Sequence, residues 1–351
     1  MYLYIVAIII IVACYFIQLR HNFWDKQPVM RDGDCQDIKV IGSIPNFKIK
    51  LNNSDIKFKQ NISNLDEVYT FLNDNFNNDY NINYSYLKYC FNKKDSINIS
   101  CYDKKTIIGF IHAQPMRIVF KKKLLNLYYV DYLCVEKYNR SKNLASLLIS
   151  TLLNSFKNKQ SIFLFKKDSY GLPYKNLLKT HYFYKDMREI VPIKLENVYN
   201  LSDKPENTNI IYNYYRKLIS KFKMYNYIDR TEFRKIFIEH NKLDLYVINN
   251  ENDIKTLVIG KKGVYKIWNK IENCFEIELI LGEIKYAEKV DKILSNVLKN
   301  NGYNFYCLSN VGLNGKFIKD NNLTRSQRVY YYTYNLNLPK LKTSEFLVNL
   351  N

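Results

Sequence analysis

Glycine, proline and histidine are scarce in this sequence of 351 residues, and each shortage excludes a class of protein. Ten glycines and seven prolines are too few for a collagenous chain or a flexible linker protein. Four histidines without metal-ligand spacing, and seven cysteines without a C-x-x-C pair, lead us to expect no metal. The odd cysteine count suits buried thiols in a reducing compartment better than a disulfide framework.

Composition and charge describe a basic globular protein. With 47% hydrophobic and 25% charged residues, the chain can bury one large or two ordinary cores. A net charge of +20 predicts attraction to a polyanion, which would be nucleic acid, acidic lipid or a phosphorylated cofactor. The abundance of Asn, Lys, Ile and Tyr is also typical of an AT-rich gene, which alone produces a diffuse positive surface without a partner.

An uncharged, apolar run covers residues 2–17, and Arg20, His21 and Lys26 follow it. At about 1.5 Å per residue this run can just cross a thin bilayer. The positive-inside rule then places the rest of the chain on the cytosolic side. We expect a membrane anchor over residues 1–19, with a buried N-terminal helix or a signal sequence as the alternatives.

The remaining chain is patterned as two successive α/β halves. Apolar spacing predicts helices over residues 65–72, 144–156, 210–222, 231–240 and 287–299, the first with Ser63 as its N-cap. Runs of alternating or continuous apolar residues predict strands over residues 107–113, 125–135, 245–248, 256–259, 275–281, 305–308 and 329–334. Polar residues and Pro205 gather near 195–208, where we expect the boundary between the halves.

The most specific segment, residues 131–146, runs from a strand through a basic turn into a helix. A helix start offers free N–H groups and the positive end of the helix dipole, so with Arg140 and Lys142 it can hold a diphosphate such as that of CoA. The backbone N–H groups of Tyr132 and Leu133, if they point out of the sheet, can stabilise a thioester oxyanion. The alternative is an ordinary solvated loop.

Several motifs resemble those of eukaryotic N-myristoyltransferases, which consist of two fused acyltransferase domains of the GCN5-related (GNAT) fold. The segment Y-L-C-V-x-K-x-x-R-S-K-x-L-A from Tyr132 is similar to the family's N-F-L-C-V-x-K-x-x-R-S-K-R-L-A-P. The resemblance continues in order along the chain, at residues 22–29, 68–76, 108–115, 172–184, 214–218 and 331–335. Departures include Ser146 for the family's Pro and the segment 323–328 in place of a glycine-rich loop.

The resemblance implies a site for myristoyl-CoA as co-substrate. It assigns cofactor contacts to the segment that grips the CoA end and to the basic turn, namely Asn22, Phe23, Trp24, Arg140, Ser141, Lys142, Asn143, Leu144 and Ala145. It places the acceptor peptide against Tyr182, Tyr184 and Leu350. The acceptor is implied to be a protein or peptide with an N-terminal glycine.

The resemblance also implies the chemistry. In the family the enzyme's own C-terminal carboxylate deprotonates the glycine ammonium, and the spacing from Asn335 to the end puts this role on Asn351. A carboxylate held in a dry pocket can act as a general base. The alternative for Asn351 is a frayed tail. We interpret His112 and His181 as core or wall residues and Cys134 as a packed thiol.

Together these observations predict a mixed α/β enzyme of two fused GNAT domains behind an N-terminal transmembrane helix. We expect an anchor over 1–19, an irregular CoA-gripping segment over 20–60, an acyl-CoA-binding domain over 61–200 and a peptide-binding domain over 201–351. We expect a monomer of divergent, viral or parasitic lineage that binds no nucleic acid. The alternatives are an inactive acyl-CoA-binding or lipid-binding structural protein, a GNAT-type enzyme for another acyl chain or acceptor, and a polyanion-binding surface protein.

Overall fold

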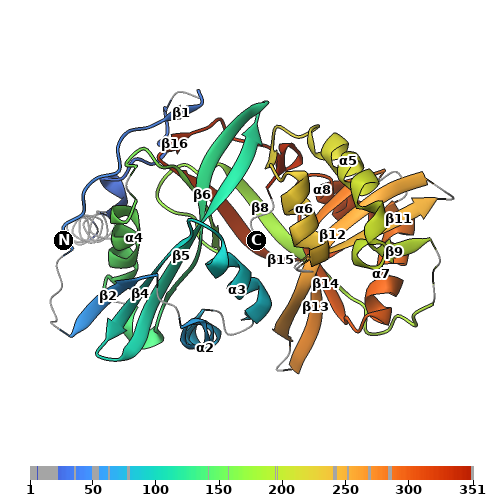
Figure 1. Cartoon of the computed structure of the whole chain (residues 1–351), viewed down its shortest axis with the longest axis horizontal. Helices are drawn as coiled ribbons and strands as arrows, with labels where there is room; N and C mark the ends of the chain where they lie inside the picture. The colour runs from blue at the N-terminus through green and yellow to red at the C-terminus, as the bar shows by residue number, and fades with distance from the viewer. Residues whose placement is uncertain are drawn as a thin grey trace.

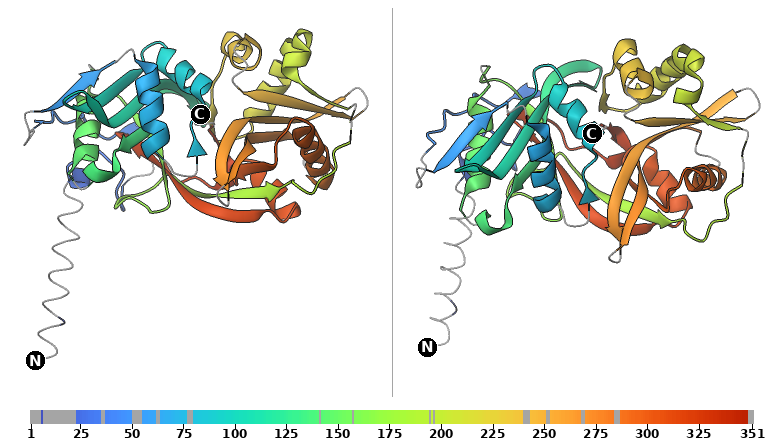
Figure 2. Two further views of the ribbon diagram at one scale, coloured as in Figure 1. Left: turned by 90° about the horizontal axis from the view of Figure 1, so that it is seen from below. Right: turned by 60° about the horizontal axis from the view of Figure 1, so that its bottom comes forward.

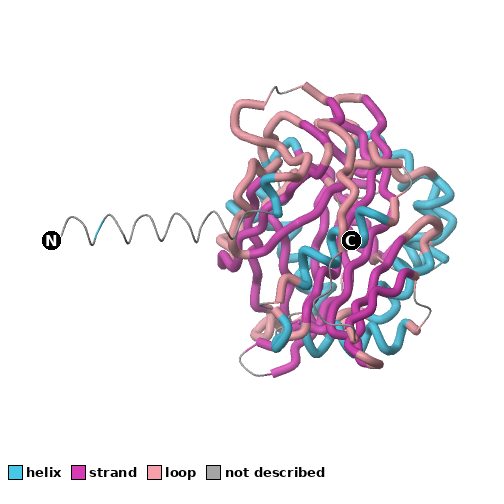
Figure 3. Tube along the Cα trace, turned by 90° about the vertical axis from the view of Figure 1, so that its left-hand side faces the viewer, coloured by secondary structure: helices cyan, strands magenta, loops and turns pink. Residues whose placement is uncertain are grey.

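One 15-stranded sheet runs through the described part of the molecule in this computed structural model (Figure 1). The structure describes Val6 and residues 23–34, 37–49, 55–61, 64–76, 80–140, 142–156, 158–193, 195, 197–239, 243–250, 253–267, 270–283 and 287–348. A separate two-stranded sheet pairs β1 (Lys39–Val40) with β16 (Leu336–Asn337). Strands fill the middle of the molecule and helices lie around them (Figure 3).

The first half of the chain builds an antiparallel meander, a helix and a parallel strand. β4 (Ile97–Asp103), β5 (Thr106–Phe120) and β6 (Lys123–Val135) run antiparallel, and β7 (Phe163–Asp168) is parallel to β6. A parallel return requires a crossover, which α4 (Leu144–Asn154) supplies with its buried leucines. The smaller elements of this half are β2 (Ile56–Gln60), α2 (Leu65–Asn75), β3 (Tyr80–Asn81) and α3 (Tyr84–Asn92).

The second half repeats this order. β11 (Asp244–Asn250), β12 (Asp253–Ile267) and β13 (Lys270–Gly282) run antiparallel, α7 (Ala287–Asn300) crosses over, and β14 (Phe305–Ser309) is parallel to β13. The other elements are β9 (Val198–Asn200), α5 (Thr208–Ile219), β10 (Met224–Asn226), α6 (Arg230–Arg234), a π-helix (Lys235–Glu239), α8 (Asn314–Asp320) and β17 (Phe346–Leu347). The predicted two-fold repetition of an α/β motif is therefore confirmed.

The two halves exchange one strand each. β8 (Leu178–Asp186) follows β7 in the chain but pairs with β14, whereas the late strand β15 (Thr324–Tyr334) pairs with β7. β8 and β15 also pair with each other, and both run beneath the two halves (Figure 2). The sheet is thus continuous across the boundary that we predicted near 195–208, and the domain limits stay a prediction.

The start of α2 shows how local sequence sets an element boundary. The side chain of Asn64 accepts a hydrogen bond from the backbone N–H of Glu67 at 3.2 Å, which satisfies a donor that the first turn cannot pair internally. Ser63, which we expected in this role, lies outside the described residues.

The membrane anchor is a correction. In the described part of the chain, no helix is both long and apolar enough to cross a bilayer, which contradicts the transmembrane helix and the membrane-anchored localisation. Residues 1–19, apart from Val6, lie outside the described residues.

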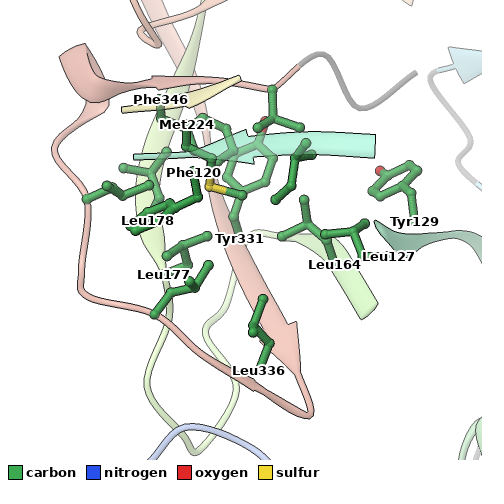
Figure 4. Close-up of a cluster of buried hydrophobic side chains, with 14 of the residues drawn as sticks. Phe120, Leu127, Tyr129, Leu164, Leu177, Leu178, Met224, Tyr331, Leu336 and Phe346 are labelled. Atoms are coloured by element: carbon green, nitrogen blue, oxygen red, sulfur yellow. The ribbon is translucent and has the colours of Figure 1, made fainter. Parts of the chain in front are cut away.

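The central core lies where the two halves meet. It combines Phe120 of β5, Tyr129 of β6, Leu164 of β7 and Tyr331 of β15 with Phe346 of β17 (Figure 4). Phe346 is fully buried, and its ring centroid lies 4.9 Å from that of Tyr331. The last described stretch of the chain is therefore fixed beside strands of the first half.

Candidate active site

A β-bulge interrupts the pairing of β5 with β6. It lies at the start of the segment from Tyr132 that carries the family resemblance. Phe110 pairs with Cys134 and His112 with Asp131, so Tyr132 and Leu133 both lie opposite Ile111. β6 and β7 pair only from Tyr128 to Val130, while β6 continues to Val135. The bulge therefore lies where β6 has parted from β7, which removes its backbone groups from the regular ladder.

The bulge holds an unusual backbone conformation. Tyr132 has φ of 54°, a left-handed conformation that costs free energy for an aromatic residue. Its backbone N–H donates to Oδ1 of Asp131 at 2.8 Å, and Leu133 is 39% exposed. One of the two N–H groups that we assigned to the oxyanion is therefore engaged by a neighbouring carboxylate.

Asp131 faces a lysine across the sheet. Burial raises the pKa of Asp131, and Lys166 of β7 and the Tyr132 N–H act in the opposite direction. Burial alone would lower the pKa of Lys166, yet neighbouring tyrosines and Asp131 raise it well above its usual value. Neither side chain was given a role from the sequence: Asp131 falls in the strand expected over 125–135 and opens the segment 131–146, and no element was predicted around Lys166. A charged residue beside an apolar run was the only sequence signal for either of them.

The start of α4 offers free backbone donors. Asn143 has φ of 58° and stands at the N-cap without a side-chain bond to the first turn, before Leu144 and Ala145. The Lys142 ammonium donates to Asn139 at 2.8 Å and the side chain is exposed, so it is free to turn toward an anion. This geometry suits phosphate binding.

Arg140 has a structural task that the sequence did not reveal. Its guanidinium donates through Nε to the carbonyl of Val135 at 3.1 Å and through one terminal nitrogen to the carbonyl of Asn75 at 2.9 Å. These bonds tie the basic turn to the end of α2. Ser141, between Arg140 and Lys142, lies outside the described residues.

The aromatic residues of the N-terminal segment lie near α4. Trp24 packs against the same hydrophobic cluster as Leu144 and Ala145, and its ring centroid lies 5.1 Å from that of Tyr174. Phe23 packs edge-on against Trp24 with centroids 5.0 Å apart. The structure thus brings together two of the segments assigned to the cofactor. Asn22 lies outside the described residues.

The tyrosines assigned to the acceptor lie on β8. Tyr182 packs against the central core, which also contains Tyr129 and Val348. Tyr184 comes two residues later on the same face of the strand and pairs with Cys307 of β14. Leu350 and Asn351 lie outside the described residues, whereas Val348 is buried in the central core, against which Tyr182 packs.

The histidine and cysteine side chains near the bulge are wall residues. His112 is fully buried, and burial lowers its pKa to about 3, so the ring is neutral near pH 7. Cys134 is a buried free thiol whose pKa burial raises to about 12. Both predictions, a core histidine and a packed thiol, are confirmed. His181 is half-exposed and contacts Arg325.

Comparisons with known proteins find similar sequences and a similar fold. Residues 40–164 match the family model of the N-terminal domain of myristoyl-CoA:protein N-myristoyltransferase. An Arabidopsis thaliana protein, provisionally named glycylpeptide N-tetradecanoyltransferase 2, is 30% identical over 159 aligned positions, which cover 39% of this chain and 37% of that protein. The chain thus matches little more than a third of that relative's length.

Two further matches span nearly the whole chain. An Amsacta moorei entomopoxvirus protein, provisionally named glycylpeptide N-tetradecanoyltransferase, is 26% identical over 331 positions that cover 90% of this chain and 97% of that protein. The crystal structure of Saccharomyces cerevisiae N-myristoyltransferase with bound myristoyl-CoA has the same fold, with a TM-score of 0.77 at 15% identity, covering 91% of this chain and 93% of that one. Residues 40–164 thus match the N-terminal domain of the N-myristoyltransferase family in sequence, and the chain as a whole has the fold of an N-myristoyltransferase.

Proposed function

We propose that this protein transfers the myristoyl group of myristoyl-CoA to the α-amine of an N-terminal glycine. The observation that carries the proposal is the bulge at Tyr132 and Leu133, which lies where β6 parts from β7 and shortly before the uncapped start of α4. One end of this site suits phosphates and the other suits a developing oxyanion. A long acyl thioester carries both groups.

In this proposal the CoA end of the donor lies against the start of α4. The free N–H groups of that turn and the Lys142 ammonium receive the diphosphate, with Asn143 shaping the turn. Arg140 acts mainly by bracing the turn through its bonds to backbone carbonyls. Phe23 and Trp24 line the approach from the N-terminal segment.

The thioester carbonyl then lies at the bulge. Its oxygen accepts hydrogen bonds from the N–H groups of Tyr132 and Leu133, and these bonds strengthen as negative charge develops on the oxygen during attack. Since the Tyr132 N–H donates to Asp131 in the free protein, the thioester oxygen has to replace the Asp131 carboxylate there.

The base in this proposal is the main-chain carboxylate of Asn351. The supporting observation is that Val348, three residues earlier, is buried in the central core with Tyr129 and Tyr182. The carboxylate takes a proton from the glycine ammonium, and the amine attacks the thioester carbon. In the tetrahedral intermediate the nitrogen gives its surplus proton to the departing sulfur, so CoA leaves as the thiol and an amide remains. Tyr182, Tyr184 and Leu350 form the wall beside the acceptor.

A transfer assay tests the proposal. The protein is incubated with labelled myristoyl-CoA and a panel of glycine-initiated octapeptides, with alanine-initiated copies of the same peptides as controls. Labelled amide on the glycine peptides alone supports the proposal. Myristoyl-CoA binding without transfer would instead support the inactive acyl-CoA-binding alternative, and transfer of another acyl chain the broader GNAT alternative. If the protein shows no binding and no transfer, all three hypotheses are refuted.

A further inference from the structure

A cleft of about 770 Å³ opens between α3 on one side and α6 with the π-helix on the other. The charged side chains in its lining are Lys88, Lys93, Lys235, Asp229 and Glu232. α3 and α6 lie at the centre of the molecule, whereas α4, where the proposed function puts the CoA phosphates, lies to the left (Figure 1). A ligand in this cleft would therefore not compete with the CoA end of the donor.

Both carboxylates of the cleft already have cationic partners. One terminal nitrogen of Arg117 on β5 lies 2.8 Å from a carboxylate oxygen of Asp229 and 3.0 Å from one of Glu232. The bond from Arg117 lowers the pKa of Asp229, which also accepts from the backbone N–H of Glu232 at 2.9 Å. The Lys93 ammonium lies 3.9 Å from Glu232. A cationic ligand would have to compete with these charged hydrogen bonds.

Two lysines of the cleft stand in the opposite situation. Lys88 on α3 and Lys235 on the π-helix are exposed and line opposite walls. Among the residues that the structure describes, no carboxylate forms an ion pair with either of them. Together with Arg117 and Lys93, four cationic groups therefore stand against two carboxylates. A cleft lined by an excess of one charge concentrates ligands of the opposite charge.

The floor of the cleft reaches toward the bulge of β6. Tyr86 on α3 lines the cleft and is only 7% exposed. Burial raises the pKa of Tyr86 well above its usual value, and the nearby Tyr132 and Asp131 act in the same direction. Tyr86 therefore lies between the cleft and the place where the proposed function puts the thioester carbonyl. An acceptor whose glycine reaches the bulge can have its following residues in the cleft.

The positive lining continues beyond this cleft. A second cleft of about 380 Å³ shares Thr231 with the first. Arg230 and Arg234 line it together with one described carboxylate, that of Glu206. A chain that leaves the first cleft across the start of α6 thus meets a further excess of cationic side chains.

We propose that this cleft selects acceptors that carry Asp or Glu among the residues after the N-terminal glycine. The inference rests on the proposed function and names the class of acceptor. Carboxylates of the acceptor pair with the ammonium groups of Lys88 and Lys235, whereas a lysine of the acceptor meets positive charge that the protein leaves uncompensated. The two lysines position the acceptor and take no part in the transfer step.

A comparison of acidic and basic acceptors tests the inference. The probes are glycine-initiated octapeptides of one neutral sequence, in which each later position in turn carries either Asp or Lys. Calorimetry on the full chain with a bound thioether analogue of myristoyl-CoA gives their affinities, and myristoyl-CoA gives their kcat/KM. At one position or more, the Asp peptide should bind roughly 5- to 50-fold more tightly than its Lys counterpart. That ratio should fall toward unity as salt rises.

Charge reversal at the two lysines assigns the preference to the cleft. Lys88→Glu combined with Lys235→Glu should abolish or invert the Asp preference. Its affinity for the acyl-CoA analogue should stay within about 2-fold of the wild type, which also shows that the variant is folded. The matched control is Lys316→Glu combined with Lys319→Glu on α8, because both lysines are exposed and the change in net charge is the same. This control should keep the Asp preference.

Three results would overturn the inference. The wild type could show no preference for Asp at any position, or a preference for Lys. The cleft variant could keep the full Asp preference, or the α8 control could lose it as well, and recognition would then not depend on the cleft. Transfer without an Asp preference would leave the proposed function intact and refute only this inference. Binding with the Asp preference but without transfer would refute the proposed function and leave a site for acidic peptides.

Discussion

The basic turn before α4 gives the sharpest prediction, because the structure separates two residues that the sequence treats alike. The Arg140 guanidinium donates hydrogen bonds to the carbonyls of Val135 and Asn75, whereas the Lys142 ammonium, within the described part of the chain, donates to the side chain of Asn139. Arg140→Ala should therefore mainly destabilise the fold. Lys142→Ala should mainly weaken acyl-CoA binding.

The magnitudes follow from exposure. Arg140 is exposed, so its two charged hydrogen bonds should together contribute about 1 to 3 kcal/mol to the free energy of unfolding, or at most about 5 °C in the melting temperature. Lys142 is also exposed, and loss of one phosphate contact there should weaken acyl-CoA binding by roughly 2- to 10-fold. That effect should shrink as salt rises and screens the charge.

Thermal unfolding and titration with a myristoyl-CoA analogue measure the two effects separately. Lys137→Ala, on the preceding exposed turn, is the matched control and should change neither quantity. If Lys142→Ala leaves affinity unchanged at low salt, the diphosphate does not lie at this turn. If Arg140→Ala abolishes binding without lowering the melting temperature, Arg140 is a ligand and our account of it as a brace is wrong.

Three further predictions concern the centre of the molecule. A few residues added after Asn351 should reduce transfer by ~10²- to 10⁴-fold in a peptide assay while sparing acyl-CoA binding. Asn351→Ala should have a mild effect on transfer because it keeps the main-chain carboxylate. Wild-type turnover by the extended chain would contradict the assigned base. The folded-state pKa of His112, about 3, lies below its ordinary value of about 6.5, so the unfolded chain binds more protons and stability should fall by about 2 kcal/mol from pH 7 to pH 5. His112→Phe should flatten that part of the pH profile in chemical denaturation, and an unaltered slope would assign it to other groups. Phe346→Ala should lower the free energy of unfolding by about 3–5 kcal/mol, and it should reduce transfer more than acyl-CoA binding because Phe346 fixes the last described strand against Tyr331. Equal loss of transfer and acyl-CoA binding would argue against that local role.

Sequence patterning predicted the elements that depend on local apolar spacing. The helix expected at 65–72 is α2, and that expected at 144–156 is α4. The strand expected to end at 113 instead runs to Phe120, through Pro115. This is possible because β4 pairs with β5 only as far as Ala113, and β10 pairs with β5 only from Ile118 onward. On the edge of β5 that these two strands share, Pro115 has no partner strand, so its missing N–H interrupts no ladder there.

Features that depend on distant contacts were out of reach of the sequence. The exchange of β8 and β15 joins residues more than a hundred positions apart, and no local pattern encodes such a pairing. In the candidate site, the motif pointed to Tyr132 and Leu133, but only the folded structure shows that Asp131 accepts a hydrogen bond from the Tyr132 N–H. We expected the anchor from the apolar run at residues 2–17 and the basic residues that follow it, and no helix in the described part of the chain supports it.

The strand exchange has a consequence for how the protein is made on the ribosome. β8 is complete at Asp186, yet its neighbours β14 and β15 begin only at Phe305 and Thr324. At about 5–20 residues per second, the nascent chain waits on the order of 10 s before β15 can join β7 to β8. During that interval the open edges of β7 and β8 can pair with other chains. Slower translation should therefore lower the yield of soluble protein, and a nascent-chain chaperone that covers these edges should restore it.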